Sequence, residues 1–440
     1  MAQSVITRLA TDIGGTFTDI VLERGEKRFT TKVLTTPQAP EEAVVEGTRL
    51  VLDEAGLGFA DLDVFVHGTT LATNAVIERK GAKTALIATD GFRDVIEIAD
   101  EGRYDQYDIF IDKPRQLVPR QLRFTVPERI DVMGKVWVDL DEAAVRKVAK
   151  ALKAEKVEAV AVAFIHSYAN GAHEQRVRDI LAREAPGIAV TLSSEVCPEM
   201  REYERTSTAV ANAYVQPLMA GYLGRLKARF AAEGYGKPIH LMTSGGSLAT
   251  LETAARFPIR LVESGPAGGA ILAAYIAAER GEDKVLSFDM GGTTAKICLI
   301  HDATPYKART FEVDRQSRFM KGSGLPVRIP VIEMVEIGAG GGSIARVDTL
   351  KRITVGPDSS GSLPGPACYG RGGELPTVTD ADVALGKIEP ARFAGGAIKL
   401  FPERSDAALD ASVGKPLSLT TSMAAHGVAE IVDENMANAA

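Results

Sequence analysis

The feature that most constrains this chain is a repeated eleven-residue segment. Residues 12–22 read DIGGTFTDIVL and residues 289–299 read DMGGTTAKICL, with the same residue at six of the eleven positions. Each copy has an aspartate at the end of an apolar strand, then two glycines, hydroxyl residues and a second apolar strand. Duplication of a whole domain is the simplest origin, so we expect two similar halves with a ligand cleft between them.

Both copies have the composition of a phosphate-binding hairpin. Glycine lets the backbone turn sharply and brings N–H groups close to an anion, and threonine adds hydroxyl donors. One copy alone is equally compatible with a plain glycine turn, but two copies favour phosphate. Neither copy follows the P-loop or the dinucleotide pattern. We therefore assign nucleotide contact to Gly14, Gly15, Thr16 and Thr18, and to Gly291, Gly292, Thr293 and Thr294.

Asp12 and Asp289 are the candidate catalytic and metal-binding residues of the two hairpins. A carboxylate beside a phosphate repels it unless a divalent cation lies between them. We therefore predict that both aspartates position Mg²⁺ or water, and that the two hairpins grip one triphosphate.

The secondary-structure pattern is that of an α/β protein. The first residues predict strands over 6–13, 20–23 and 28–34, and Pro40 with two glutamates predicts a helix to about residue 55. Short apolar strands then alternate with amphipathic helices, which predicts βαβ units and a largely parallel sheet. A long helix is expected over 198–234. The Gly- and Pro-rich stretch after residue 323 lacks periodicity and is expected to be ordered loop around a site.

Composition narrows the class of partner. The net charge of −7 is spread along the chain without a basic block, so neither nucleic acid nor a membrane surface is expected as a partner. The three cysteines are far apart and lack C-x-x-C spacing, so neither a zinc ribbon nor a disulfide framework is suggested. The beginning of the chain has no signal-peptide pattern and no apolar run is long enough to cross a bilayer. A cytoplasmic protein with a small-molecule site is the expectation.

Several segments resemble a known family. The two hairpins are similar to the phosphate motifs of the actin, Hsp70 and hexokinase superfamily. More narrowly, the chain resembles the hydantoinase and 5-oxoprolinase family through HGTTLATNAVIERKGAKTALIATDGFRDVIEI, EYERTSTAVANAYVQP, ESGPAGGA, GAGGGSIARVD and GPACYGRGG followed by PTVTDADVALG. The resemblance implies duplicated actin-like (ribonuclease H-like) ATPase domains with an interdomain nucleotide cleft. It places an N-terminal domain at 1–197 and a second half at 198–440.

The resemblance also implies an activity. Family members use ATP and Mg²⁺ to phosphorylate the oxygen of a cyclic amide or imide, after which water opens the ring. A companion B-type subunit is the expected partner. Two alternatives stay open: an ATP-dependent carboxylase subunit of the acetone or acetophenone type, and a non-enzymatic ATP switch like actin or Hsp70.

Other candidate residues lie outside the repeat. The family landmark gives His67, in HGTT, a catalytic role at the substrate or phosphate; the alternative is a core histidine bonded within a helix-capping cluster. Gly340, Gly341 and Gly342 form a loop dense enough in glycine to line a site. SGPAGG at 264–269 is either an anion-binding helix start or a packing element.

The chain departs from the family pattern in two ways. Lys296 stands where many members have an acidic residue, so a role of that acid does not carry over. Relatives continue beyond the position of Ala440 and supply a later Gly-rich segment that closes the nucleotide pocket, so we expect the second domain to be incomplete here.

Overall fold

The computed structural model describes residues 5–14, 17–36, 38–100, 102–316, 320–361, 363–396 and 399–439. These residues form two units of mixed α/β structure. The first unit comprises Met1–Gly268 and Lys307–Ile332, and the second comprises Gly269–Tyr306 and Glu333–Ala440.

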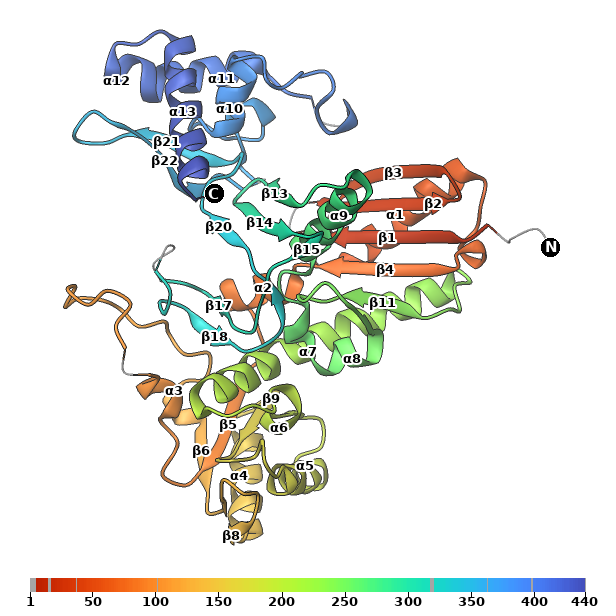
Figure 1. The fold of residues 1–440 in the computed structure, drawn as a ribbon, viewed down its shortest axis with the longest axis vertical. Helices are drawn as coiled ribbons and strands as arrows, with labels where there is room; N and C mark the ends of the chain where they lie inside the picture. The colour runs from red at the N-terminus through yellow and green to blue at the C-terminus, as the bar shows by residue number, and fades with distance from the viewer. Residues whose placement is uncertain are drawn as a thin grey trace. The chain divides into compact units, whose positions relative to one another are not determined.

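The first unit is built on a six-stranded sheet (Figure 1) with the order β12–β11–β4–β1–β2–β3. The first three strands form the predicted antiparallel meander, and β4 and β11 continue the sheet parallel to β1. This order, with its antiparallel second strand, is that of a ribonuclease H-like sheet. The strands are β1 (Thr7–Ile13), β2 (Phe17–Arg24), β3 (Lys27–Leu34), β4 (Val64–Thr69), β11 (Ile239–Met242) and β12 (Leu248–Thr250).

Alternation in the sequence fixes which face of this sheet is buried. Every second residue of β1 is buried, beginning with Thr7, and the intervening residues are exposed. Helix α1 (Pro40–Ala55) covers that face behind β2 and β3. Its sequence sets its limits, since proline suits the first turn and Gly56 ends the helix in the left-handed conformation, with φ of 67°.

A four-stranded sheet is inserted between β4 and β11. Its order is β10–β9–β5–β6 and all its pairs are parallel. β9 reads AVAVA and is buried on both faces, as expected for a parallel strand covered on both sides. The elements are β5 (Thr84–Thr89), β6 (Arg123–Val126), β9 (Ala159–Ala163), β10 (Ala189–Leu192), α4 (Glu142–Ala154) and α5 (Ala172–Glu184).

Helix α7 (Glu202–Ala232) joins the two sheets of the first unit. Its N-terminal half packs on β9 and β10, and further along it lies beside α1. Arg225 donates to Glu41 at 2.6 Å and Arg229 donates to Glu42 at 2.6 Å. These pairs explain why α1 carries two glutamates in its first turn: they meet the arginines of the predicted long helix as well as the positive helix end.

Short elements complete the first unit. They are α2 (Leu71–Ile77), α3 (Val95–Ile98), β7 (Arg129–Ile130), β8 (Val136–Val138), α6 (Ser193–Val196), α8 (Leu251–Arg256), β16 (Lys307–Ala308), β17 (Phe311–Val313), β18 (Leu325–Val327) and β19 (Val331–Ile332).

The second unit repeats the first hairpin of the fold. β13 (Lys284–Met290) pairs antiparallel with β14 (Ala295–His301), as β1 pairs with β2, and β15 (Thr304–Pro305) and β20 (Val335–Ile337) both pair with β14. The other elements are α9 (Ser264–Arg280), which begins in the first unit, β21 (Ser343–Val347), β22 (Ile353–Ser359), α10 (Val378–Ala384), α11 (Pro402–Leu409), α12 (Lys415–Leu417) and α13 (Thr421–Ala439).

The second sheet is a shorter copy of the first within the described residues. No described strand pairs with the outer edge of β13, whereas β4 pairs with the corresponding edge of β1. Leu286 and Leu299 correspond in the repeat to Leu9 and Leu22. The first two are 44% and 50% exposed, and the latter two are 1% and 0% exposed. The face that α1 covers in the first unit is therefore only partly covered here, by Val432 and Met436 of α13. None of the helices described is both long and apolar enough for a bilayer span.

Candidate functional site

The first hairpin places Asp12 next to the end of β1. The N–H of Gly14 donates to the carbonyl of Phe17 at 2.9 Å, which closes the turn. Gly15 and Thr16 lie outside the described residues. Thr18 is buried, and its hydroxyl lies 3.0 Å from that of Thr35, which donates to the carbonyl of Gly14 at 2.9 Å. In this structure Thr18 therefore supports the turn from its buried side.

Two glycines flank the carboxylate of Asp12. A methyl group added at Gly68, in β4, would lie 2.9 Å from Oδ1, and one added at Gly265, in α9, would lie 2.9 Å from Oδ2. Real side-chain carbons do not approach oxygen that closely, so only glycine leaves the carboxylate in place at both positions. HGTT and SGPAGG are thus brought together around Asp12.

Ser264 fixes this arrangement. Its hydroxyl accepts from the N–H of Thr69 at 3.2 Å and donates to the carbonyl of the same residue at 3.1 Å. Thr70 donates from both its N–H and its hydroxyl to the carbonyl of Ile13, each at 3.1 Å. The ends of β1 and β4 and the start of α9 are therefore tied together at the first hairpin.

His67 is fully buried and engaged on both sides of its ring. Nδ1 lies 2.6 Å from the hydroxyl of Thr11, and Nε2 lies 2.7 Å from the hydroxyl of Tyr222 in α7. Burial lowers its pKa to about 4, so the imidazole is neutral near pH 7. The side chain lies in the core and links β1, β4 and α7, which is the arrangement of the core-histidine alternative.

The second hairpin closes with the same hydrogen bond as the first. The N–H of Gly291 donates to the carbonyl of Thr294 at 2.9 Å, and Asp289 lies next to the end of β13. Asp289, Gly291, Gly292 and Thr293 are exposed. The duplication seen in the sequence therefore extends to the turn geometry.

The glycine loop at 340–342 lies directly against the second hairpin. Gly341 donates to the carbonyl of Gly291 at 3.0 Å, and Gly342 donates to that of Gly292 at 2.7 Å. Two of the predicted glycine groups are therefore neighbours in space as well as candidates for one function.

The charges beside the two aspartates are inverted between the copies. Asp12 lies opposite Asp19, which pairs with Lys32 of β3 at 2.6 Å. Asp289 lies opposite Lys296, whose other cross-strand neighbour is Glu336 of β20. Lys296 thus lies between two acidic cross-strand neighbours, and each hairpin keeps both signs of charge.

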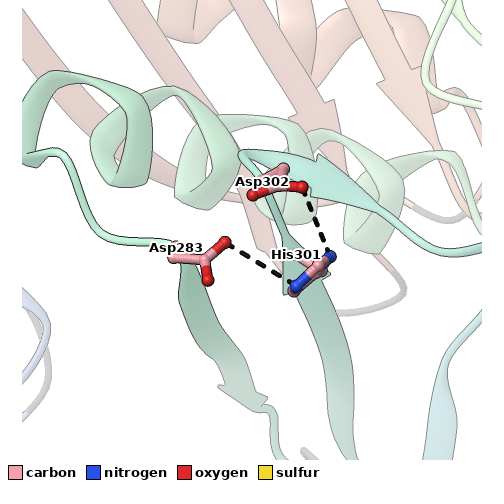
Figure 2. Close-up of side chains that lie close together, drawn as sticks. All are labelled: Asp283, His301 and Asp302. Carbon is pink, nitrogen blue, oxygen red and sulfur yellow. Dashed lines mark ion pairs between the residues drawn. The ribbon is translucent and has the colours of Figure 1, made fainter.

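Another group of metal-ligand side chains lies at the far end of the second hairpin (Figure 2). Asp283, His301 and Asp302 each offer a ligand atom within 4.8 Å of the others, and all three are exposed. The carboxylate of Asp283 raises the pKa of Asp302, as expected for two close acids. Asp283 immediately precedes β13 and lies six positions before Asp289, which is about 20 Å along an extended strand. This cluster is therefore distinct from the glycine end of the hairpin.

A buried carboxylate organises the GPACYGRGG loop. Asp380 accepts from Thr377, through N–H and hydroxyl at 2.9 Å each, and from Ser405 at 2.9 Å. It also accepts from the N–H groups of Ala367 at 3.1 Å and Cys368 at 2.8 Å. Sequence reasoning missed this residue, although Thr377 and Asp380 have the spacing of a capping box at the start of α10.

Two sequence patterns of one family match almost the whole chain. The pattern described as the hydantoinase/oxoprolinase N-terminal region matches residues 8–185, and that described as hydantoinase/oxoprolinase matches residues 205–440. The protein belongs to the hydantoinase/oxoprolinase family. The family predicted from the motifs is thereby confirmed.

Relatives in this family differ in their named activities. The alpha subunit of caprolactamase from Pseudomonas jessenii is 35% identical, over 98% of this chain and 61% of the relative. The gamma subunit of acetophenone carboxylase from Aromatoleum aromaticum is also 35% identical, over 99% of this chain and 61% of the relative. This hydantoinase/oxoprolinase chain therefore spans about three-fifths of the length of these relatives.

Solved structures confirm the mixed α/β fold. The ATP-dependent caprolactamase of Pseudomonas jessenii matches with a TM-score of 0.81 and 35% identity, over 98% of this chain and 62% of that one. A nucleotide-free acetone carboxylase matches with a TM-score of 0.83 and 29% identity, over 99% of this chain and 62% of that one.

Proposed function

We propose that this protein is the nucleotide-binding part of an ATP-dependent cyclic amide hydrolase that acts with a companion subunit. The observation that carries the proposal is the pair of Asp-x-Gly-Gly-Thr hairpins, which close with the same 2.9 Å hydrogen bond in both units. The similarity to the ATP-dependent caprolactamase supports ATP dependence and a lactam substrate, and the relatives are named as subunits.

In this proposal both hairpins bind one molecule of ATP. The exposed glycines and Thr293 of the second hairpin offer N–H and hydroxyl donors to phosphate oxygens. The first hairpin offers the same sequence, and the closely packed ends of β1, β4 and α9 hold it in place. Asp12 and Asp289 then act from the two hairpins on the same triphosphate.

The residues at the first hairpin fit a Mg²⁺ ion. Asp12 is exposed, and a side chain at either Gly68 or Gly265 would collide with its carboxylate oxygens. Carboxylate oxygen is the ligand that Mg²⁺ uses in phosphoryl-transfer sites. When bound, the ion would neutralise phosphate charge and orient the γ-phosphate. Asp12 and Asp289 are the residues that would hold it, directly or through water.

The proposed reaction has two stages. The amide oxygen attacks the γ-phosphorus of ATP, a new P–O bond forms, and the bond to ADP breaks. Water then adds to the activated carbon and the C–N bond breaks with proton transfer to nitrogen, which leaves an acyl phosphate. A second water hydrolyses the acyl phosphate to the carboxylate and phosphate. The products are the ring-opened amino acid, ADP and phosphate. Phosphorylation helps because it stabilises negative charge that would otherwise develop on the amide oxygen.

His67 takes a positioning role in this scheme. Its neutral ring is enclosed by the core and contacts Thr11, the neighbour of Asp12 in β1. We infer that it fixes the register between β1 and β4, and so the position of Asp12 beside Gly68. Direct contact of His67 with substrate would require a different side-chain position from the one described.

A second function follows from the carboxylase relatives. The same activation of a carbonyl oxygen would serve ketone carboxylation, with bicarbonate as co-substrate, and the acetophenone carboxylase subunit is as similar to this chain as the caprolactamase subunit. The experiment is ADP release by the full-length protein with its companion subunit, on a panel of hydantoin, oxoproline, caprolactam, acetone and acetophenone.

Each result of the panel separates the candidates. Ring-opened product formed with ATP and without bicarbonate supports the amide hydrolase. ADP release that requires both a ketone and bicarbonate supports the carboxylase instead. Slow ATP turnover that no substrate accelerates would contradict both, and would favour an ATP-driven conformational switch.

A further inference from the structure

The glycine loop of residues 338–343 contacts the turn of the second hairpin through two backbone hydrogen bonds. We propose that this loop is the orienting element of the second hairpin, and that it turns the N–H groups of Gly292 and Thr293 outward to bind a phosphate oxygen. The phosphate part of this inference rests on the proposed function, whereas the orienting contact rests on the geometry of the second unit.

Peptide planarity connects the two groups of atoms. In a trans peptide the C=O of one residue and the N–H of the next point in opposite directions. The carbonyls of Gly291 and Gly292 both point at the loop, where Gly341 and Gly342 donate to them. The N–H groups of Gly292 and Thr293 must therefore point away from the loop.

These two N–H groups are available for a ligand. Neither donates to a described residue, while the neighbouring N–H of Gly291 is used within the turn. Gly292 and Thr293 are also exposed. Two successive N–H groups aimed in one direction make a concave anion-binding surface, and the hydroxyl of Thr293 adds a further donor. The chemical class that fits is a phosphate oxyanion.

The close approach explains the run of glycines in the loop. A methyl group at Gly340 would lie 2.7 Å from both the N and the C of Thr293, and one at Gly342 would lie 2.9 Å from the carbonyl oxygen of Gly292. Both contacts are with backbone, which cannot swing aside as a flexible side chain can. A side chain at either position would displace the hairpin.

The loop is held from behind by α10 and by the residue that follows β22. Thr379 donates to the carbonyl of Gly341 from its N–H and from its hydroxyl, each at 2.8 Å. Ser360 donates to the carbonyl of Gly342 from its N–H at 2.9 Å. Thr379 precedes Asp380, whose buried hydrogen bonds fix the start of α10. Helix α10 therefore supports the glycine loop, and the glycine loop in turn supports the second hairpin.

In the first hairpin a side chain, rather than a backbone N–H group, holds the equivalent carbonyl. Gly14 corresponds to Gly291 in the repeat, and its carbonyl accepts from the hydroxyl of Thr35 at 2.9 Å. A side-chain donor from the end of the meander thus does there what the backbone of Gly341 does here. That both copies hold the same carbonyl supports an orienting function over incidental packing.

The test uses paired substitutions in the full-length protein with its companion subunit. Mg-ATP affinity is measured by calorimetry for Gly340→Ala, Thr379→Val and Thr379→Ser. Gly224→Ala, in α7, is the control, because a methyl group at that glycine meets nothing within 4 Å. Hydrogen exchange of segments 289–294 and 338–343 is measured without nucleotide in the same proteins.

We expect Gly340→Ala to weaken Mg-ATP binding by about tenfold or more, since it displaces the hairpin backbone. Thr379→Val removes one hydrogen bond and is expected to weaken binding about 3- to 10-fold, while Thr379→Ser retains the hydroxyl and binds like the wild type. Exchange of both segments should rise in Thr379→Val. The Thr379 pair decides the question even if Gly340→Ala fails to fold.

The affinity and the hydrogen-exchange measurements separate failure of this inference from failure of the proposed function. Wild-type affinity in Gly340→Ala and Thr379→Val would overturn the inference and leave the proposed function standing. A wild-type protein that binds no Mg-ATP would overturn the proposed function and the phosphate part of the inference. Unchanged exchange of segment 289–294 in Thr379→Val would overturn the orienting contact itself.

Discussion

Replacement of Gly265 by alanine is predicted to impair phosphoryl transfer without loss of stability. The new methyl carbon would lie 2.9 Å from Oδ2 and 3.2 Å from Oδ1 of Asp12. Favourable carbon contacts begin at about 3.5 Å, so the carboxylate must move by about 0.5 Å. A misplacement of about 1 Å at a catalytic group costs up to about 100-fold, so we expect about a tenfold loss of kcat, or about 1.4 kcal/mol.

The free energy of unfolding of Gly265→Ala should rise, whereas its kcat falls. Gly265 lies in the first turn of α9, where alanine is a better helix former than glycine by up to about 1 kcal/mol. The assay is ADP release as a function of Mg²⁺, with thermal unfolding of the same preparation. Gly224→Ala, in helix α7 with open space around it, should keep wild-type kcat. The reasoning is refuted if Gly265→Ala retains wild-type kcat and Mg²⁺ dependence.

Two further changes test buried polar groups. Burial holds the pKa of His67 at about 4, below about 6.5 in an unfolded chain, so the unfolded state binds the extra proton between these values. The free energy of unfolding should therefore fall by up to about 3 kcal/mol as pH drops from about 6.5 to 4. In urea titrations, His67→Gln should flatten this pH dependence. The same pH dependence in His67→Gln as in the wild type would contradict the buried neutral ring. Asp380→Asn puts an amide donor among five donors, so it should lower the free energy of unfolding by about 2–3 kcal/mol in the same titrations. The matched control is Asp406→Asn at an exposed position, which should leave the free energy of unfolding unchanged. A loss below about 0.5 kcal/mol in Asp380→Asn would argue against the hydrogen-bond network.

Local patterns were sufficient for much of the fold. The meander and α1 were predicted to within a few residues, because period-two alternation and the Pro-Glu-Glu start are determined by neighbours in sequence. The predicted parallel sheet was found as β5, β6, β9 and β10, since buried parallel strands read as short continuous apolar runs. The predicted long helix corresponds to α7 at Glu202–Ala232.

The Gly- and Pro-rich stretch shows the limit of such patterns. It was expected to be loop, yet it contains β20, β21 and β22. These strands pair with other short strands through backbone hydrogen bonds, which leave little trace in side-chain periodicity. Loops do occur there: 338–342 lies between β20 and β21, and 363–376 follows β22 with one short 3-10 helix at Ala367–Tyr369.

The sequence repeat pointed to the candidate residues of both hairpins, but not to the residues that hold those hairpins in place. Repetition identified both aspartates and both glycine pairs. The glycines at 68 and 265 depend on a carboxylate distant in sequence, and Thr35 depends on a carbonyl 21 positions away, so no local pattern marks them. For His67 the sequence left two roles open, and only burial with two hydroxyl partners distinguishes the described arrangement.

The measurement that tests the central claim most directly is a double-mutant cycle of Asp12→Asn and Asp289→Asn on Mg-ATP affinity. If both carboxylates act on one metal-bound triphosphate, removal of either makes the other less important, and the combined loss should differ from the sum by more than about 1 kcal/mol. His301→Ala, in the separate cluster at the far end of the hairpin, should leave affinity unchanged. Losses that add to within about 0.5 kcal/mol would mean that the two hairpins work independently, and would contradict a shared nucleotide site.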